Sequence, residues 1–441
     1  MIIYQLFLRP FSPDGTIKGI LGYLPRIAEL GTDVIYLTSC CKADGDTNQE
    51  YWSPRHMRSR IDNPKNPYRV MDYYKLDEEY GTIDDLCELV RIAHENSLRV
   101  IFDIVYLHCG PNAVFIGDHP DFVRHDGEGN IIYNAYHFPT LNFENPELRR
   151  YLIDNMRFWI EKCGFDGFRC DVGDDIPLDF WREAVSELKA DYPNLIMLNE
   201  GKKPEYIREV FDINYHAGWT GPLNEVLRGI KTADALVDID RQTREAYGDI
   251  TPVYLRGTEN HDYANDYYDR RIDAVDSNAA ELSYVLNFTL DGVPFIYNGN
   301  ELADGNRHSI FGTRMLAKEL GVDWSLAESE KATTRFEFLK SLTTFRKAYP
   351  ALADCPVVWL ESTAPKALLT FKRELEDSNI FVVANLSREE TLAEIEFELK
   401  TLKILFERDI DIACDGEKTQ VRIAPHGFAV IETEKLFYRK Q

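Results

Sequence analysis

The chain has 441 residues, a hydrophobic content of 44% and a formal net charge of −24. The hydrophobic content is sufficient for a large core, and the length predicts two or three domains, or one large barrel with an appendage. The negative charge argues against nucleic acid and anionic membrane surfaces as partners, and it makes a neutral substrate the first expectation.

The sequence shows neither a secretory signal nor a membrane span. No basic stretch followed by an apolar run stands at the start, and no run reaches the roughly 18 apolar residues that a membrane helix requires. The eight cysteines form no C-x-x-C pair, and most lie in strand-like or helix-like patterns as small apolar residues do. We therefore expect a cytoplasmic protein in a reducing compartment.

The first part of the chain alternates between strand and helix patterns. Gly31 marks the end of the first helix, Thr82 is suited to cap the second, and Pro146 occupies the first turn of the third. A polar loop over 38–72 and an irregular insert over 109–145 interrupt the alternation. The predicted strands are 2–8, 33–37 and 98–105, and the predicted helices are 19–30, 82–96 and Pro146–Cys163.

The alternation continues through the middle of the chain. Strands are predicted at 164–172, 195–198, 210–213, 251–256 and 294–297, and helices at 179–190, 223–246, 274–290 and 335–348. Eight strand-then-helix units over about 350 residues predict a parallel sheet closed into a (β/α)8 TIM barrel, with an open doubly wound sheet as the alternative.

After residue 351, short β-rich runs alternate with polar turns, which predicts an antiparallel β-sandwich domain. We expect three domains in an α/β fold. The barrel covers 1–108 and 146–350, a short inserted domain covers 109–145, and an all-β domain covers 351–441.

Polar side chains follow four of the predicted strands, at the face of a barrel where active sites are built. They are Asp103 and His108, then Arg169 and Asp171, then Glu200, then His261 and Asp262. Alternate residues of a strand share a face, so Arg169 should favour the ionised form of Asp171, unless the two are only a structural ion pair. Glu200 has no cation on its own strand and should keep a proton among the other acids. One carboxylate and one carboxylic acid are the pair that glycoside hydrolysis needs.

Four short segments follow one another in a specific order. They are Phe102-Asp-Ile-Val-Tyr-Leu-His108, Gly167-Phe-Arg-Cys-Asp171, Leu198-Asn-Glu200 and Glu259-Asn-His-Asp262. These segments resemble the four motifs of the α-amylase family, glycoside hydrolase family 13. Residues 73–85 resemble the segment before the family's third strand, and residues 292–301 resemble its eighth strand, so the resemblance spans roughly residues 2–351.

The resemblance implies a retaining mechanism. Asp171 would be the nucleophile, Glu200 the general acid and base, and Asp262 the residue that binds sugar hydroxyls and stabilises the transition state. The residues implied to bind the reacting sugar are Tyr68, His108, Arg169 and His261. Tyr68 would offer its ring to the apolar face of the sugar. The insert would be a short domain B, and the C-terminal region domain C.

Two positions depart from the calcium-dependent members of the family. Leu107 stands where an Asn is usual and Thr140 where an Asp is usual, and leucine offers no side-chain oxygen to a hard cation. We therefore expect no calcium there, and no metal or cofactor in the site. The segment Asp44-Gly-Asp-Thr-Asn48 resembles the start of a calcium loop, but Arg55 stands where the closing glutamate belongs. We interpret that segment as a solvated loop.

The expected activity is that of an α-amylase-like or α-glucosidase-like glycosidase. Its substrate would be an oligosaccharide, a maltodextrin or a short α-glucoside, and the protein a monomer or homodimer.

The run Val172-Gly-Asp-Asp175 differs from the Lys-His pair common after the nucleophile in α-amylases, and Arg69 replaces a common Asp, so the linkage that is cleaved stays open. The alternatives are a transglycosylase or phosphorylase with the same intermediate, and a non-catalytic sugar-binding relative.

Overall fold

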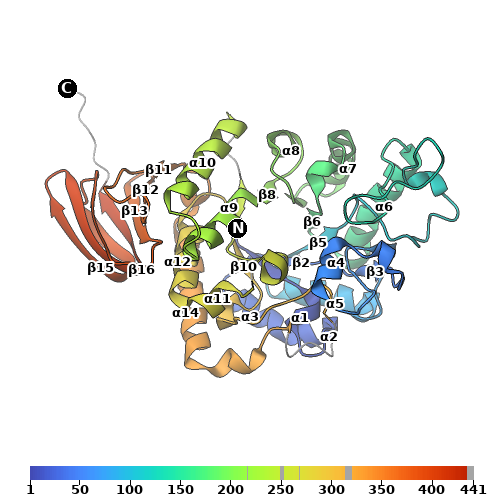
Figure 1. Ribbon diagram of the computed structural model, residues 1–441, viewed down its shortest axis with the longest axis horizontal. Coiled ribbons are helices and arrows are strands. Elements are labelled where there is room, and N and C mark those ends of the chain that lie inside the picture. The colour runs from blue at the N-terminus through green and yellow to red at the C-terminus, as the bar shows by residue number, and fades with distance from the viewer. Residues whose placement is uncertain (216, 249–252, 268, 313–319, 435–441) are drawn as a thin grey trace. The chain divides into compact units, whose positions relative to one another are not determined.

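The computed structural model describes residues 1–215, 217–248, 253–267, 269–312 and 320–434. Parallel strands form a closed eight-stranded barrel in the order β1-β10-β9-β8-β7-β6-β5-β2 (Figure 1). The barrel predicted from the alternation is confirmed, and the open sheet is excluded. The strands are β1 (Ile3–Leu6), β2 (Val34–Leu37), β5 (Arg99–Ile104), β6 (Gly167–Cys170), β7 (Ile196–Asn199), β8 (Ile213–Tyr215), β9 (Tyr254–Arg256) and β10 (Val293–Tyr297).

The chain divides into two compact units, which are described separately below. The first unit consists of Met1–Tyr215, Glu259–Arg271 and Ile296–Glu337. The second consists of His216–Thr258, Ile272–Phe295 and Phe338–Gln441. The three domain boundaries expected from the sequence stay a prediction.

In the first unit, two helices match their predicted positions because both have strong local end signals. Helix α5 (Ile83–Glu95) begins with a reciprocal capping box, in which Thr82 and Asp85 each bond to the other's backbone N–H. Helix α6 (Pro146–Cys163) is capped by the Asn145 side chain and ends at Gly164, whose φ of 81° suits glycine. Further helices of this unit are α1 (Leu8–Phe11), α7 (Leu178–Asp191) and α8 (Pro204–Glu209).

The predicted helix 19–30 is wrong as a single element. It consists of α2 (Ile17–Ile20) and α3 (Leu24–Glu29), joined by a 3-10 turn over Leu21–Tyr23. Pro25 explains the break, because it has no N–H to donate to the carbonyl of Leu21, which accepts from Leu24 instead.

The stretch 38–72 is more ordered than the polar loop that the sequence suggests. Strand β3 (Cys41–Ala43) pairs antiparallel with β4 (Val70–Leu76), and helix α4 (Pro54–Ser59) lies between them in the chain. The Ser53 side chain caps α4, and Pro54 fits its first turn. The insert 109–145 folds back in short antiparallel bridges, among them that of His108 with Thr140.

Two other predicted elements also differ, and a third is described only in part. The strand expected at 210–213 begins only at Ile213, because the Val210 N–H bonds to Tyr206 and ends α8. Of the strand expected at 251–256, residues 251 and 252 lie outside the described residues. The helix expected at 223–246 is two helices, α9 (Ala217–Leu227) and α10 (Asp234–Tyr247), and Gly229 with φ 74° lies between them. Three further helices are α11 (Ile272–Val275), α12 (Ser277–Thr289) and α14 (Glu330–Ala348).

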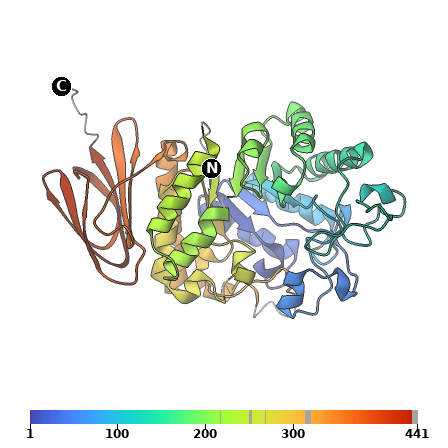
Figure 2. The same cartoon turned by 45° about the horizontal axis from the view of Figure 1, so that its top comes forward.

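The C-terminal region is an antiparallel β-domain, as predicted. Its strands, orange to red in Figure 2, form one six-stranded sheet rather than the two packed sheets of a sandwich. In this sheet, β16 pairs with β13, β14 and β15. Phe381, Ile395, Val421 and Ile431 belong to its apolar core. The strands are β11 (Val357–Trp359), β12 (Leu368–Glu374), β13 (Ser378–Asn385), β14 (Thr391–Ile395), β15 (Thr401–Asp415) and β16 (Lys418–Glu434).

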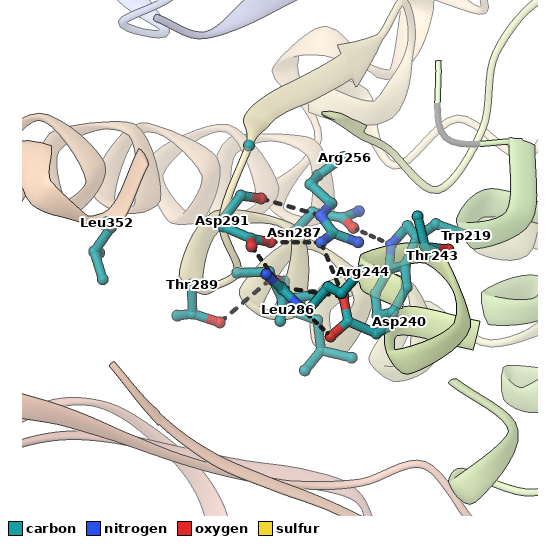
Figure 3. A network of polar contacts seen from close by, with 12 residues as sticks. Trp219, Asp240, Thr243, Arg244, Arg256, Leu286, Asn287, Thr289, Asp291 and Leu352 are labelled. Atoms are coloured by element: carbon teal, nitrogen blue, oxygen red, sulfur yellow. Dashed lines mark hydrogen bonds and ion pairs between the residues drawn. The ribbon is translucent and has the colours of Figure 1, made fainter. Parts of the chain in front are cut away.

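A buried ion network lies in the second unit (Figure 3). Asp291 accepts from Arg256 at 2.5 Å and from Arg244 at 2.6 Å, and Arg244 also donates to Asp240 at 2.8 Å. Burial alone would raise the pKa of Asp291, but the guanidinium groups of Arg256 and Arg244 outweigh it and lower the pKa to about 2. The network therefore links β9, α10 and the turn before β10 through ionised groups.

In the described part of the chain, no helix is long and apolar enough to cross a membrane.

Candidate active site

A pocket of about 450 Å³ opens in the first unit where β5, β6 and β7 end. Six of the residues that the sequence singled out line this pocket: Tyr68, His108, Asp171, Glu200, His261 and Asp262. The seventh, Arg169, belongs to β6 and is 1% exposed. It does not line the pocket itself but contacts Asp171 and Glu200, which do. The structure thus brings all seven together.

The guanidinium of Arg169 binds three carboxylates at once. Its Nη1 atom lies 2.6 Å from Asp103 and 2.8 Å from Asp171, and its Nη2 atom lies 2.7 Å from Glu200. The strand register explains the first contact, because Asp103 of β5 and Arg169 of β6 are direct neighbours. Burial would lower the pKa of Arg169, but the surrounding acids, Asp103 foremost, raise it well above its ordinary value. The guanidinium therefore stays charged.

The electrostatic surroundings of the two predicted catalytic acids differ from the expectation. Glu200 does have a cation partner, because Arg169 reaches it from the neighbouring strand. Burial raises the pKa of both Asp171 and Glu200, although Arg169 opposes the shift. Since three acids share one guanidinium, the cluster favours keeping a proton on one of them.

Hydrogen bonds indicate which oxygens of the two acids are restrained. The Oε2 atom of Glu200 accepts a hydrogen bond from the backbone N–H of Val172 at 2.9 Å and forms an ion pair with Arg169. The Oδ1 atom of Asp171 accepts from Arg169 at 2.8 Å. The second oxygen of each carboxyl is the one available for a proton or for a substrate.

Asp262 has a separate cation partner, Arg55 of α4, whose Nη1 atom contacts its Oδ1 atom. Burial would raise the pKa of Asp262, but His261, Arg55 and Arg169 together lower it below its ordinary value. No sequence pattern indicates that Arg55 belongs to the site. Arg55 and Asp262 are far apart in the chain, and only the fold brings α4 next to the segment after β9.

Tyr68 and His261 form a hydrogen-bonded chain at the base of the pocket. The Tyr68 hydroxyl donates to Asp103 at 2.8 Å and lies 2.8 Å from Nε2 of His261, whose Nδ1 lies 2.7 Å from the amide of Gln5. The rings of Tyr68 and His261 stack with centroids 5.6 Å apart. Burial lowers the pKa of His261 to about 4, so the ring is neutral at neutral pH.

His108 is neutral for the same reason, because burial lowers its pKa to about 4. Its Nε2 lies 2.9 Å from the carbonyl of Tyr68, and its Nδ1 lies 3.1 Å from the amide nitrogen of Asn134. The Tyr136 ring, 42% exposed, lies 5.7 Å from the His108 ring. Tyr136 and Phe311 line the pocket and were missed from the sequence. A signal existed for Tyr136, in the aromatic run Tyr133-Asn-Ala-Tyr-His-Phe138 of the insert.

The segment that resembles a calcium loop is solvated only in part, because Gly45, Thr47 and Asn48 are exposed whereas Asp44 is buried. Asp44 is 1% exposed, and the buried Arg69 guanidinium donates to the carbonyls of Asp44 and Asp46 at 2.8 Å and of Pro64 at 2.9 Å. Within the residues that the structure describes, no group of three or more His, Cys, Asp or Glu side chains is arranged to hold a metal ion. The expected absence of calcium beside Leu107 stays a prediction.

Comparisons with known proteins agree with this geometry. Residues 10–126 and 126–217 match the family model of the α-amylase catalytic domain. The chain is 25% identical over 501 residues to α-amylase 3 of Dictyoglomus thermophilum, covering 98% of this chain and 93% of that protein. A cyclomaltodextrinase of Geobacillus thermopakistaniensis is 25% identical over 460 residues, covering 95% of this chain and 70% of the relative.

The fold also matches that of solved structures. The maltogenic α-amylase AmyB from Thermotoga neapolitana has a TM-score of 0.82 and 23% identity, with 99% of both chains covered. An α-amylase from Lactobacillus plantarum has a TM-score of 0.76 and 24% identity, with 98% of both chains covered. Its four motifs on one barrel face and the matching family model make the chain similar to the α-amylase family, glycoside hydrolase family 13.

Proposed function

We propose that this protein is a retaining glycosidase that cleaves α-glucosidic bonds in maltodextrins or short α-glucosides through a covalent glycosyl-aspartate intermediate. The observation that carries the proposal is Arg169 in contact with both Asp171 and Glu200 in the wall of one pocket. The names of the relatives, α-amylase and cyclomaltodextrinase, support this substrate class.

In the first step, the free oxygen of ionised Asp171 attacks the anomeric carbon of the sugar. The bond between that carbon and the glycosidic oxygen breaks, and the oxygen takes the proton that Glu200 carries. Arg169 holds the other oxygen of Asp171, so the nucleophile is fixed during the attack. The backbone N–H of Val172 and Arg169 hold Oε2 of Glu200, which leaves Oε1 for the proton.

In the second step, Glu200 is ionised and removes a proton from a water molecule. The water oxygen bonds to the anomeric carbon, the bond to Asp171 breaks, and the sugar leaves with its original configuration. Over the whole cycle, Glu200 loses one proton and regains one, and the Arg169 guanidinium stays charged throughout.

The other pocket residues position the sugar. Ionised Asp262 binds hydroxyls of the reacting sugar and stabilises the positive charge that develops on the ring. His108, His261 and Tyr68 are neutral groups on the same wall and contact the sugar by hydrogen bonds or through their ring faces. The half-exposed Tyr136 ring offers a second apolar platform.

A phosphorylase or transglycosylase with the same intermediate is the second candidate. The exposed Arg58 of α4 lines the pocket mouth, and a cation there is suited to inorganic phosphate. Incubating the protein with substrate and phosphate distinguishes the two reactions. Sugar 1-phosphate as the main product would establish phosphorolysis, and free sugar alone would establish hydrolysis.

The test of the main proposal is a screen of the purified protein against maltose, maltotriose, isomaltose, sucrose, trehalose and starch. We expect reducing sugar to be released from at least one of these, and Asp171→Asn to abolish the release. Activity on none of them, or an Asp171→Asn variant as active as wild type, would contradict the proposal.

We also propose a cytoplasmic protein that acts as a monomer or homodimer. All eight cysteines are free thiols, which is typical of a reducing compartment.

A further inference from the structure

Helix α4 brings a second guanidinium to the pocket. The Arg55 side chain is 24% exposed and contacts the Asp262 side chain, which is 20% exposed. The centre of the guanidinium also lies 5.9 Å from the centroid of the Phe311 ring. Ser53 and Pro54 fix the start of α4, and both line the same pocket, so the backbone that carries Arg55 is itself held at the site.

The two guanidinium groups of the site serve different acids. Arg169 binds Asp103, Asp171 and Glu200, whereas Asp262 has its direct ion pair with Arg55. The negative charge of Asp262 in turn helps to raise the pKa of Glu200, after the larger effect of burial. Removal of Arg55 would therefore first change the protonation of Asp262, and leave Arg169 in contact with its three acids.

Several titratable or charged groups face Asp262 from the surrounding elements. They are Arg55 of α4, Arg169 of β6, Glu200 after β7, and Tyr68, Tyr136, His261 and Tyr297. Burial raises the pKa of the three tyrosines, so they stay neutral in the working range. Arg169 is shared among three acids, and His261 is neutral at neutral pH. Arg55 is therefore the cation in direct contact with the Asp262 carboxylate.

We propose that Arg55 is a positioning residue, which keeps the carboxylate of Asp262 ionised and oriented toward the sugar hydroxyls. The inference rests on the proposed function, because it assigns Arg55 a role in the same reaction. Arg55 acts through Asp262 and forms no bond with the reacting atoms. In the alternative, Arg55 has only a structural role, in which its contact with the Phe311 ring holds α4 in place.

The first test compares Arg55→Ala and Arg55→Lys with wild type in the pH dependence of kcat/KM, on the best substrate of the screen. We expect Arg55→Ala to lose at least about tenfold, mainly in kcat, and its acid limb to move up by about one pH unit or more. Arg55→Lys should keep most of the acid limb, because it retains the charge. Free guanidinium ion should restore part of the Arg55→Ala activity.

Arg157→Ala is the matched control. Arg157 is 25% exposed and pairs with Asp191 at 2.7 Å, away from the pocket. It should behave as wild type and should not respond to guanidinium. An Arg55→Ala enzyme with the wild-type acid limb and kcat would overturn the inference, as would an Arg55→Lys enzyme as impaired as Arg55→Ala.

The second test does not depend on activity, so it separates this inference from the proposed function. Carbon-13 labelling of the aspartate carboxyls, with Asp262→Asn to assign the signal, gives the titration of Asp262 by NMR. We expect the Asp262 signal to titrate at higher pH in Arg55→Ala than in wild type and in Arg55→Lys. An unchanged titration would overturn the inference even in an active enzyme. If Arg55→Ala does not fold, Arg55→Gln replaces it in both tests.

Discussion

The Nη2 atom of Arg169 lies 2.7 Å from the Oε2 atom of Glu200. The same side chain holds Asp171 through Nη1 at 2.8 Å, so one charged group contacts both predicted catalytic acids. Two carboxyls that face one cation favour sharing one proton between them. The proposed mechanism needs that state, with Asp171 ionised and Glu200 protonated.

Glu200→Gln removes the proton donor and should lower kcat/KM on maltotriose by about 10²–10⁴-fold. The loss should be much smaller in the first step on an aryl glucoside, because a phenolate with a low pKa leaves without protonation. Steady-state and burst kinetics on both substrates measure the difference. The control Glu95→Gln, at the exposed end of α5, should match wild type. Equal losses on the two substrates would contradict the role of Glu200 as the acid.

The histidines of the pocket should make the fold sensitive to acid. Burial lowers the pKa of His108 and His261 to about 4, whereas an unfolded histidine titrates near about 6.5. Between these values the unfolded chain binds protons that the native protein does not, so stability falls as the pH falls. Each histidine contributes up to about 1.4 kcal/mol per pH unit in this window.

His108→Asn should therefore lose less stability than wild type between pH 7 and pH 5. Urea denaturation at several pH values gives the free energy of unfolding for both proteins. The same pH dependence in wild type and variant would show that His108 is not held neutral by the fold.

The buried network of the second unit should be essential for stability. Asp291→Asn leaves Arg256, which is 0% exposed, without its closest anion, and removal of one partner of a buried ion pair costs about 3–5 kcal/mol. Urea denaturation at neutral pH measures the loss. The control Asp238→Asn removes an exposed partner of Arg241 on α10 and should cost less than about 1 kcal/mol. Similar losses for the two variants would contradict the importance of the network.

We predict that chelator leaves the melting temperature unchanged. The family resemblance implies calcium-binding Asn and Asp residues at the positions of Leu107 and Thr140, and the Arg69 guanidinium occupies the carbonyl-lined loop at Asp44. A ligand that binds the native state stabilises it, so removing a structural ion would lower the melting temperature. A drop of several degrees on adding EDTA, reversed by added calcium, would show that a metal site exists.

The sequence predicts those parts of the fold that depend on local signals. Pro146 in the first turn predicts helix α6 at its observed bounds, and the structure adds the Asn145 cap and the Gly164 terminator at its two ends. The break between α2 and α3 also has a local cause in Pro25, although the apolar pattern runs across it. The barrel was predictable from the repeated alternation of strands and helices. That prediction does not depend on the exact ends of any one strand or helix.

The site was predictable to the extent that its residues follow strands. Asp171 and Glu200 come directly after β6 and β7, and His108 follows the end of β5 by four residues, so the closure of the barrel brings them together. The contact between Arg169 and Glu200 was missed because the two residues belong to neighbouring strands. The long arginine side chain bridges the distance between them. Arg55 was missed because its position depends on the fold of the stretch 38–72, which no periodic pattern describes.

The most direct test of the proposed mechanism is to trap the covalent intermediate. A fluorinated α-glucosyl fluoride forms the glycosyl-enzyme quickly and releases it slowly, so the adduct accumulates for peptide mass spectrometry. We predict that the peptide containing Asp171 gains the mass of one glycosyl group, and that Asp171→Asn gains none. A label on another residue, or an active enzyme whose first product has the inverted anomeric configuration, would contradict a retaining mechanism with Asp171 as the nucleophile.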